Sequence, residues 1–471
     1  MYWSPEVEHG NIEYKRQLIN VPQVRIEKLT SQMKWRLNEG RGEAIYVIGI
    51  EDDGFLIGIP QKELIATQNI LQKIAKTLSC KVTVISDISG QHGIVRKLLI
   101  RKTTDHTYIN IRIAVCGSEN SGKSTLIAVL NQNKLDNGRG SMRIHCFNHL
   151  HEMESGKTSS ISHQLLGFDS KGKCVNDTHY EFDTISGETS LSTIVDKSHK
   201  IISFIDLPGF NNYSKTSLRG LTNNYPDYCL LVIDCITDSI IEYSKLINTL
   251  NIPIILVITK KDLIKHTINV TAIKHIKSFY ISSVTGDGLD EFKSYLNLLP
   301  QCNDWSHLDS HNREFIIEKK YFIDGVGTIV SGVLSSGKIS INDELLLGPD
   351  NTGKFHKVKI TSIYRNYKSV DFIRSGQFAT CCLNNVHMEI RAGQVLLDKP
   401  MYSLTLQVLI NTNKLKNKRI LMQCHAIRQI VEVIKIHDNI ITIKLLQRPE
   451  YFRKGMNVIF NNKFIGIITK L

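Results

Sequence analysis

The octapeptide Gly117-Ser118-Glu119-Asn120-Ser121-Gly122-Lys123-Ser124 constrains the fold of this sequence more than any other segment. It follows an apolar run at residues 111–116 and precedes residues 125–130, which can open a helix. Its glycines permit a tight backbone turn whose successive N–H groups point at phosphate oxygens. The pattern therefore predicts a phosphate-binding loop between a buried strand and a helix of an α/β fold.

Two residues of this loop carry specific chemistry. Lys123 is expected to bridge the β- and γ-phosphates of a nucleotide, and the Ser124 hydroxyl is expected to ligate magnesium. The other contacts predicted from the loop are Gly117, Ser118, Glu119, Asn120, Ser121, Gly122 and Thr125. Because such a motif also occurs by coincidence, its assignment depends on further motifs in the same chain.

One further motif, Asp206-Leu207-Pro208-Gly209, follows the apolar run at residues 201–205. Ligands of open α/β sheets collect at the carboxyl ends of the strands, which is where this motif is expected to lie. We expect Asp206 to hold magnesium through water and the Gly209 N–H to contact the γ-phosphate.

A third motif, Thr259-Lys260-Lys261-Asp262, follows residues 252–258. The Asp262 carboxylate can accept two hydrogen bonds from the N1 and N2 donors of guanine, which adenine does not offer. Lys260 is expected to lie over the base, and Ser282 and Ser283 are expected to complete its pocket. Thr259 stands where most GTPases have asparagine, so it offers a hydroxyl in place of an amide. Together the motifs predict a site for Mg²⁺ with GTP or GDP.

The pattern along the chain predicts four domains. Residues 1–108 are expected to form a small α/β unit, and residues 109–305 a G domain with a mostly parallel sheet, because their apolar runs are too continuous for half-exposed strands. Glycine-punctuated β-rich segments follow and indicate two β-barrels, at residues 306–400 and 401–471. In the first unit we expect a helix at residues 62–78 and strands at residues 43–50, 81–85 and 97–101.

The net charge of +13 is concentrated near the C-terminus, since residues 401–471 hold twelve Lys and Arg against three acidic residues. This excess favours a polyanionic partner such as tRNA, mRNA or the ribosome, with a solvated lysine-rich surface as the alternative. His145, Cys146, His149 and His151 could likewise form either a metal site or a polar surface.

The other compositional features indicate a cytoplasmic protein without a membrane partner, and we expect a monomer. The N-terminus lacks the pattern of a signal peptide, and the apolar runs are far shorter than a bilayer requires. The ten cysteines include no Cys-x-x-Cys spacing, which favours a reducing compartment.

From about Ser4 to Leu471, the sequence resembles the GTP-binding protein 1 and 2 family of elongation-factor-Tu-like translational GTPases. The resemblance implies a G domain followed by two barrels, with Thr158 as the switch residue that closes over magnesium. It also implies that residues 325–332 help to bind aminoacyl-tRNA. The similar strings are Glu39-Gly40-Arg41-Gly42-Glu43-Ala44, Leu135-Asp136-Asn137-Gly138-Arg139-Gly140, Glu154-Ser155-Gly156-Lys157-Thr158-Ser159-Ser160 and Leu345-Leu346-Leu347-Gly348-Pro349-Asp350.

The sequence departs from this family pattern at residues linked to hydrolysis. Phe210 stands where the family has a histidine that orients the attacking water, and Asn120 replaces an aspartate of the phosphate loop. The phenylalanine side chain can neither donate a hydrogen bond to water nor accept one from it. The catalytic group is therefore unassigned, and GTPase turnover is expected to be slow. One alternative is a GTP-dependent module that binds RNA or the ribosome without appreciable turnover, and another is an RNA-binding protein that ignores nucleotides.

Overall fold

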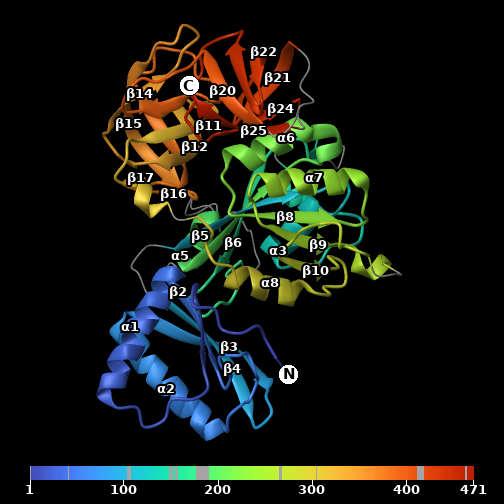
Figure 1. Cartoon of the computed structure of the whole chain (residues 1–471), viewed down its shortest axis with the longest axis vertical. Coiled ribbons are helices and arrows are strands. Elements are labelled where there is room, and N and C mark those ends of the chain that lie inside the picture. The colour runs from blue at the N-terminus through green and yellow to red at the C-terminus, as the bar shows by residue number, and fades with distance from the viewer. Residues whose placement is uncertain are drawn as a thin grey trace.

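The structure is a computed structural model of the whole chain, shown in Figure 1. It describes residues 2–40, 42–102, 108–147, 152–153, 158–176, 190–264, 268–303, 305–410, 418–461 and 464–471, without the side chains of residues 190 and 211–214. In the described part, no helix is both long enough and apolar enough to cross a membrane.

The N-terminal part of the chain forms a four-stranded sheet in the order β1-β2-β4-β3, with two helices on one face (Figure 1). The predicted helix and three predicted strands correspond to α2, β2, β3 and β4, whereas helix α1 was not predicted. The opposite face of the sheet packs against Leu298 of the next domain. The bounds are β1 (Ile12–Lys15), α1 (Gln23–Glu39), β2 (Glu43–Ile48), α2 (Gln61–Thr77), β3 (Cys80–Ser89) and β4 (Ile94–Lys102).

The middle of the chain forms a six-stranded sheet in the order β10-β9-β8-β5-β7-β6. All its pairings are parallel except that between β6 and β7, so the mostly parallel sheet is confirmed. The strands are β5 (Ile109–Cys116), β6 (Ser162–Phe168), β7 (Lys200–Asp206), β8 (Tyr228–Ile233), β9 (Ile254–Ile258) and β10 (Lys277–Tyr280).

Helices cover both faces of this sheet, and its strands are buried between two apolar clusters. This explains why the strands are apolar without alternation. The helical segments are α3 (Lys123–Gln132), η1 (Met142–Cys146), α5 (Ser190–Lys197), α6 (Phe210–Asn223), α7 (Asp238–Thr249), η2 (Lys261–Leu263), α8 (Leu289–Leu298) and η3 (Ser306–Leu308).

The next part of the chain closes into a barrel in the order β14-β19-β11-β12-β18-β15, because β14 pairs with both β19 and β15. β16 extends β15, and β13 pairs with β17. The strands are β11 (Glu314–Ile323), β12 (Gly327–Ser336), β13 (Lys338–Ser340), β14 (Glu344–Gly348), β15 (His356–Arg365), β16 (Lys368–Ser369), β17 (Phe372–Arg374), β18 (Phe378–Asn384) and β19 (Val395–Leu397).

The C-terminal strands form a second closed barrel in the order β20-β23-β22-β21-β24-β25. Both predicted barrels are therefore confirmed, and in Figure 1 they lie together on the side of the central sheet away from the N-terminal unit. The strands are β20 (Thr405–Ile410), β21 (Arg419–Cys424), β22 (Ile427–His437), β23 (Ile440–Leu445), β24 (Asn457–Phe460) and β25 (Phe464–Lys470).

A buried ionic network joins the N-terminal sheet to the central one. Glu43 of β2 accepts hydrogen bonds from Arg101 Nε at 2.5 Å and from Lys200 Nζ at 2.7 Å. Lys200 also donates to the carbonyl oxygens of Asn297 and Leu299, at 2.7 and 2.6 Å. Burial lowers the pKa of Lys200 to about 8, although the charge of Glu43 counteracts it. The two sheets are thus tied together at the amino end of β7.

Candidate nucleotide-binding site

The predicted phosphate loop lies at the carboxyl end of β5, between that strand and α3. Gly117 has a φ of 152°, and a Cβ there would lie 2.1 Å from the carbonyl oxygen of Val232. Gly122, with a φ of 87°, adopts the left-handed conformation just before the first residue of α3. These two positions require glycine, which explains the spacing of the motif.

Three side chains predicted to hold magnesium converge beside this loop. The Ser124 hydroxyl donates to Asp206 Oδ2 at 2.7 Å and lies 2.8 Å from Thr158 Oγ1. Asp206 is the last residue of β7, next to β5 in the sheet, so the fold brings its carboxylate to the start of α3. The convergence joins residues separated by 82 positions in the sequence.

The electrostatics of this cluster suit a hard cation. Asp206 is fully buried, and burial raises the pKa of its carboxyl to about 6. Its Oδ1 is buried and has no hydrogen-bond partner among the described residues. An unpartnered carboxylate oxygen beside two hydroxyls matches the oxygen ligands that Mg²⁺ prefers. The residues present therefore fit a magnesium ion.

Lys123 is also buried, and burial lowers its pKa. Its Nζ donates to the Ser118 carbonyl oxygen at 2.7 Å, within the phosphate loop. A narrow cavity of about 50 Å³ lies beside it. The cavity is lined by Glu119, Asn120, Gly122, Lys123, Ser124, Thr125, Arg143, Phe147, Thr158 and Gly209.

Most of the predicted loop residues therefore face one cavity, and the others support its wall. Gly209 packs closely on the loop, since a Cβ at Gly209 would lie 2.5 Å from Glu119 Cγ. Asn120 adopts a left-handed φ of 60°, and the Ser121 hydroxyl donates to the Ser118 carbonyl oxygen at 3.0 Å. Arg143 and Phe147 were not predicted from the sequence, because no local motif marks their positions.

The predicted base-recognition residues lie together at the carboxyl end of β9. Ser282 Oγ donates to Asp262 Oδ1 at 2.5 Å, which holds the carboxylate in place. Lys260 Nζ donates to Asp234 Oδ2 at 2.7 Å, a partner that the sequence did not indicate. Ser282 therefore fixes the Asp262 carboxylate, and Asp234 fixes the Lys260 side chain. Recognition of a base requires side chains that are held rigidly in this way.

Thr259 connects the base-recognition loop to the phosphate loop. Its hydroxyl donates to the carbonyl oxygen of Ser121 at 2.6 Å, and its side chain is buried. The hydroxyl therefore makes a cross-link between the two loops although asparagine is absent.

Ser283 has a backbone role, since its carbonyl oxygen accepts the Asp136 N–H at 2.9 Å. Asp136 in turn accepts from the N–H groups of Gly138, Gly140 and Met142, each at 2.9 Å. These bonds hold residues 136–142 against the base-recognition loop. The sequence marked Asp136 only as part of a family-like string, so its structural role was missed.

Phe210 opens α6, directly after Gly209. Its ring stacks on Tyr243, with ring centroids 4.5 Å apart, and is only 6% exposed. The ring belongs to an apolar cluster on one face of the central sheet and does not line the phosphate cavity. A side chain in this orientation does not position a water at the γ-phosphate.

The His145–Cys146 part of the alternative metal site lies in η1. Cys146 is buried and its thiol donates to the Ser124 carbonyl oxygen at 3.4 Å, whereas His145 is exposed. His149 and His151 lie outside the described residues. Within the described part of the chain, no group of three or more His, Cys, Asp or Glu side chains could hold a metal ion.

Comparison with known proteins identifies the family to which the chain is similar. The family model "Elongation factor Tu GTP binding domain" matches residues 109–384. GTP-binding protein 2 of Mus musculus is 34% identical over 537 aligned residues, which cover 99% of this chain and 88% of that protein. GTP-binding protein 1 of Xenopus laevis is 32% identical over 504 aligned residues, which cover 94% of this chain and 76% of that protein.

Among solved structures, translation elongation factor SelB from Methanococcus maripaludis, in complex with the GTP analogue GPPNHP, has a similar fold. The TM-score is 0.56 at 17% identity, and the match covers 78% of this chain and 80% of that one. The fold is therefore that of an elongation-factor-Tu-like G domain with β-barrels. With the sequence matches across almost its full length, the chain belongs to the GTP-binding protein 1 and 2 family of elongation-factor-Tu-like translational GTPases.

Proposed function

We propose that this protein binds GTP and GDP with magnesium and uses the nucleotide as a switch for engaging RNA or the ribosome. One observation carries the proposal: beside the phosphate loop, the Ser124 hydroxyl lies 2.7 Å from Asp206 Oδ2 and 2.8 Å from Thr158 Oγ1, although the three residues are far apart in the sequence. The same edge of the sheet carries Asp262, oriented by Ser282 for the guanine base.

In this proposal each predicted residue has one task. Lys123 binds the β- and γ-phosphates, and Asp262 and Lys260 recognise the base. Ser124, Thr158 and Asp206 would hold the magnesium ion, which neutralises charge on the β- and γ-phosphate oxygens when bound. The contact between Thr158 and Ser124 supports a switch, because it joins Thr158 to the predicted magnesium residues.

We further propose that hydrolysis is slow, since the Phe210 ring packs on Tyr243 instead of facing the phosphates. The second candidate function is a GTP-dependent binding module that is reset by nucleotide exchange, and the same observation favours it. Single-turnover hydrolysis with and without ribosomes separates the two.

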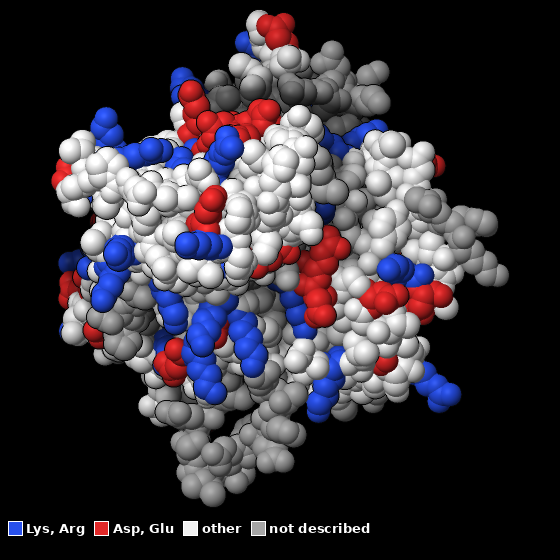
Figure 2. All heavy atoms as spheres, turned by 90° about the horizontal axis from the view of Figure 1, so that it is seen from below, with Lys and Arg blue, Asp and Glu red and all other residues white. Residues whose placement is uncertain are grey.

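The RNA part of the proposal rests on charge. The face seen in Figure 2 mixes basic and acidic side chains, as solvated surfaces do, whereas residues 401–471 carry a net charge of +9. We place the RNA contact on the second barrel for this reason.

We also propose the four domains at residues 1–108, 109–305, 306–400 and 401–471, and a monomer that acts in the cytoplasm.

Asp262→Asn should weaken GTP binding by about 2 kcal/mol or more, because a charged hydrogen-bond acceptor is lost. The same change should improve binding of xanthosine triphosphate, whose additional carbonyl can accept from the new amide. Titration with fluorescent derivatives of both nucleotides measures the two affinities. Asp287→Asn is the matched control, since Asp287 is exposed and lies 3.8 Å from Lys261 in a loose ion pair. Unchanged GTP affinity in Asp262→Asn would show that another group reads the base.

RNA binding through the second barrel should weaken steeply with salt, with a slope near −0.7 per neutralised phosphate for a single strand. Replacing Lys414, Lys416, Lys418 and Arg419 with alanine should flatten that slope; the first two lie outside the described residues. The matched control replaces four exposed lysines of the N-terminal helices, Lys28, Lys62, Lys73 and Lys76. If both variants change the slope equally, the effect reflects total charge and the assignment to the barrel is wrong.

A further inference from the structure

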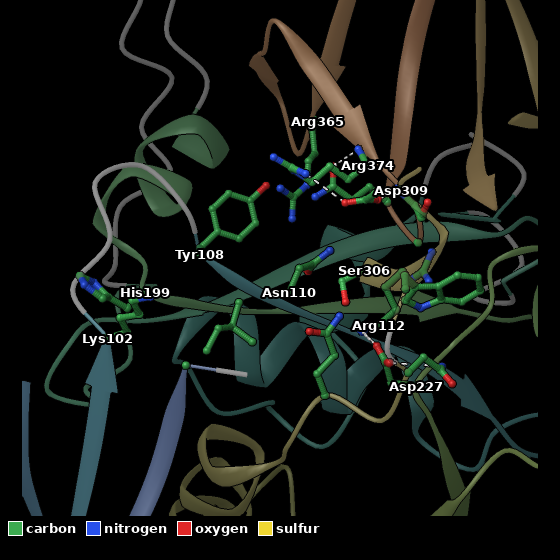
Figure 3. Close-up of a pocket in the computed structure, with 18 of the residues that line it drawn as sticks. Lys102, Tyr108, Asn110, Arg112, His199, Asp227, Ser306, Asp309, Arg365 and Arg374 are labelled. Atoms are coloured by element: carbon green, nitrogen blue, oxygen red, sulfur yellow. Dashed lines mark hydrogen bonds and ion pairs between the residues drawn. The ribbon is translucent and has the colours of Figure 1, made fainter. Parts of the chain in front are cut away.

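A second cavity, of about 980 Å³, lies where the N-terminal unit, the central sheet and the first barrel meet (Figure 3). Its walls include Lys102 of β4, Asn110 and Arg112 of β5, and Arg365 and Arg374 of the first barrel. It lies near the amino end of β5, whereas the phosphate loop follows the carboxyl end. Gly117 follows Arg112 by five positions along the strand, or about 16 Å, so the two sites are distinct.

Arg112 brings a buried cation with an unused donor to this cavity. The residue is only 5% exposed, and its Nη1 is buried without a hydrogen-bond partner among the described residues. Asp227 is the nearby acid, but its Oδ2 accepts the backbone N–H of Arg112 at 2.9 Å and its Oδ1 accepts from Asn303 at 3.4 Å. Burial lowers the pKa of Arg112, which reports the cost of holding this charge.

Arg365, the last residue of β15, brings a second such cation from the barrel. Its Nε is buried and likewise lacks a hydrogen-bond partner in the described part of the chain. Its guanidinium lies over the ring of Tyr108, 4.5 Å from the centroid, as Figure 3 shows. Burial lowers the pKa of Arg365, and its positive charge contributes to the lowered pKa of Arg112. Two positively charged side chains therefore line the same cavity.

The other arginines of this cavity already have acidic partners. Arg101 donates to Glu43 at 2.5 Å, and Arg374 donates to Asp309 at 3.0 Å. A buried arginine with an unsatisfied donor is costly unless an anion completes it. Arginine also matches the oxygens of a phosphate with two parallel hydrogen bonds. Tyr108, Trp305 and Phe372 add flat aromatic surface to the same walls.

We propose that this cavity binds a phosphate group between Arg112 and Arg365, with its attached nucleoside against the aromatic lining. The phosphate belongs either to a free mononucleotide or to the 5′-terminal nucleotide of an RNA strand. The volume falls within the range of about 300–1,000 Å³ that is usual for ligand pockets, which also prefer domain junctions. This site goes beyond the proposed function, because it uses neither the phosphate loop nor the basic second barrel.

The test uses the full chain saturated with GDP and magnesium, so that the phosphate loop is filled. Three probes are titrated: adenosine 5′-monophosphate, a 5′-phosphorylated RNA tetranucleotide and the same tetranucleotide with a 5′-hydroxyl. We expect the phosphorylated RNA to bind at least about tenfold more tightly than the hydroxyl form, as a charged bidentate contact provides. If adenosine 5′-monophosphate also binds, a free mononucleotide is sufficient to fill the site. If only the phosphorylated RNA binds, the ligand is the 5′ end of an RNA strand.

Arg365→Gln and Arg112→Gln should each lower the affinity for the phosphorylated probes about tenfold or more. Arg374→Gln is the matched control in the same cavity, and its effect should stay below about threefold because its charge is already paired. Thermal melting checks folding, and Arg365→Gln decides alone if the Arg112 variant does not fold. GDP affinity, measured separately, should be equal in all variants, so a failure of the nucleotide site is recognised independently. The proposal is overturned if neither phosphorylated probe binds, if the hydroxyl form binds equally well, or if Arg365→Gln and Arg374→Gln have the same effect.

Discussion

Glu43→Gln should destabilise the junction between the N-terminal and central sheets by about 3–5 kcal/mol, the usual cost of removing one member of a buried ion pair. The change leaves Arg101 and Lys200 as buried cations without a counter-charge; they are 2% and 0% exposed. Urea unfolding followed by tryptophan fluorescence measures the loss, because two of the three tryptophans, Trp3 and Trp35, lie in the N-terminal unit.

Glu51→Gln is the matched control, because its ion pair with Arg16 is exposed and such pairs contribute about 0–1 kcal/mol. The penalty in Glu43→Gln should also be smaller at pH 9 than at pH 7. The pKa of Lys200 in the folded protein is already lowered to about 8, and losing Glu43 lowers it further. Since the unfolded lysine keeps its ordinary pKa, this group adds stability as the pH rises above about 8. If Glu43→Gln and Glu51→Gln unfold at the same urea concentration, the buried ionic network contributes nothing to the stability of the junction.

Intrinsic GTP hydrolysis should be at least about 10²-fold slower than in a relative with histidine at the position of Phe210, the low end of what an acid–base or positioning group supplies. Magnesium-dependent GTP binding should remain normal, because Lys123, Ser124 and Asp206 are all present. Phosphoryl transfer to water depends on positioning and charge stabilisation, and both Phe210 and Asn120 lack the groups involved. Single-turnover hydrolysis, with and without ribosomes, measures the rate.

Phe210→His should recover only part of the rate, because a ring in the present orientation packs against Tyr243 and away from the phosphates. Adding Asn120→Asp should recover more than the sum of the separate changes in free energy, since both groups act on one reaction. Phe210→Leu is the control that keeps an apolar side chain, and it should stay as slow as the parent protein. A ribosome-stimulated rate in the parent protein equal to that of its relatives would contradict the assignment of slow turnover.

The phosphate-loop residues and Asp206 could be predicted because each ends or follows a buried strand, whereas Thr158 was predicted only from the family resemblance. Parallel strands bring their carboxyl ends to one edge, so the order of motifs indicates that Ser124 and Asp206 meet. The central sheet was predictable for the same reason, as its continuous apolar runs require burial on both faces.

Other features depend on contacts that no local pattern encodes. Strand β6 mixes polar and apolar residues and pairs antiparallel with β7. Its sequence therefore lacks the continuous apolar run by which the other strands of the central sheet were predicted. Helix α1 was also missed. Its buried Arg36 forms an ion pair with Glu13 at 2.6 Å, and this partner lies outside the helix, so the helix's own sequence does not reveal the contact. The Thr259 cross-link and the Arg112–Arg365 cavity likewise join residues that are distant in the sequence, so only the folded chain reveals them.

The central claim, a guanine-specific nucleotide site that works with magnesium, is tested most directly by equilibrium titration of the purified protein with fluorescent GTP, GDP and ATP, with and without Mg²⁺. We expect GTP and GDP to bind and ATP to bind at least about 10²-fold more weakly, because Asp262 finds no paired donors on adenine. Removing magnesium should weaken GTP binding, since no cation would then offset the charges of the phosphates and of the buried Asp206 carboxylate. Equal affinities for GTP and ATP, or no binding of either guanine nucleotide, would contradict the account.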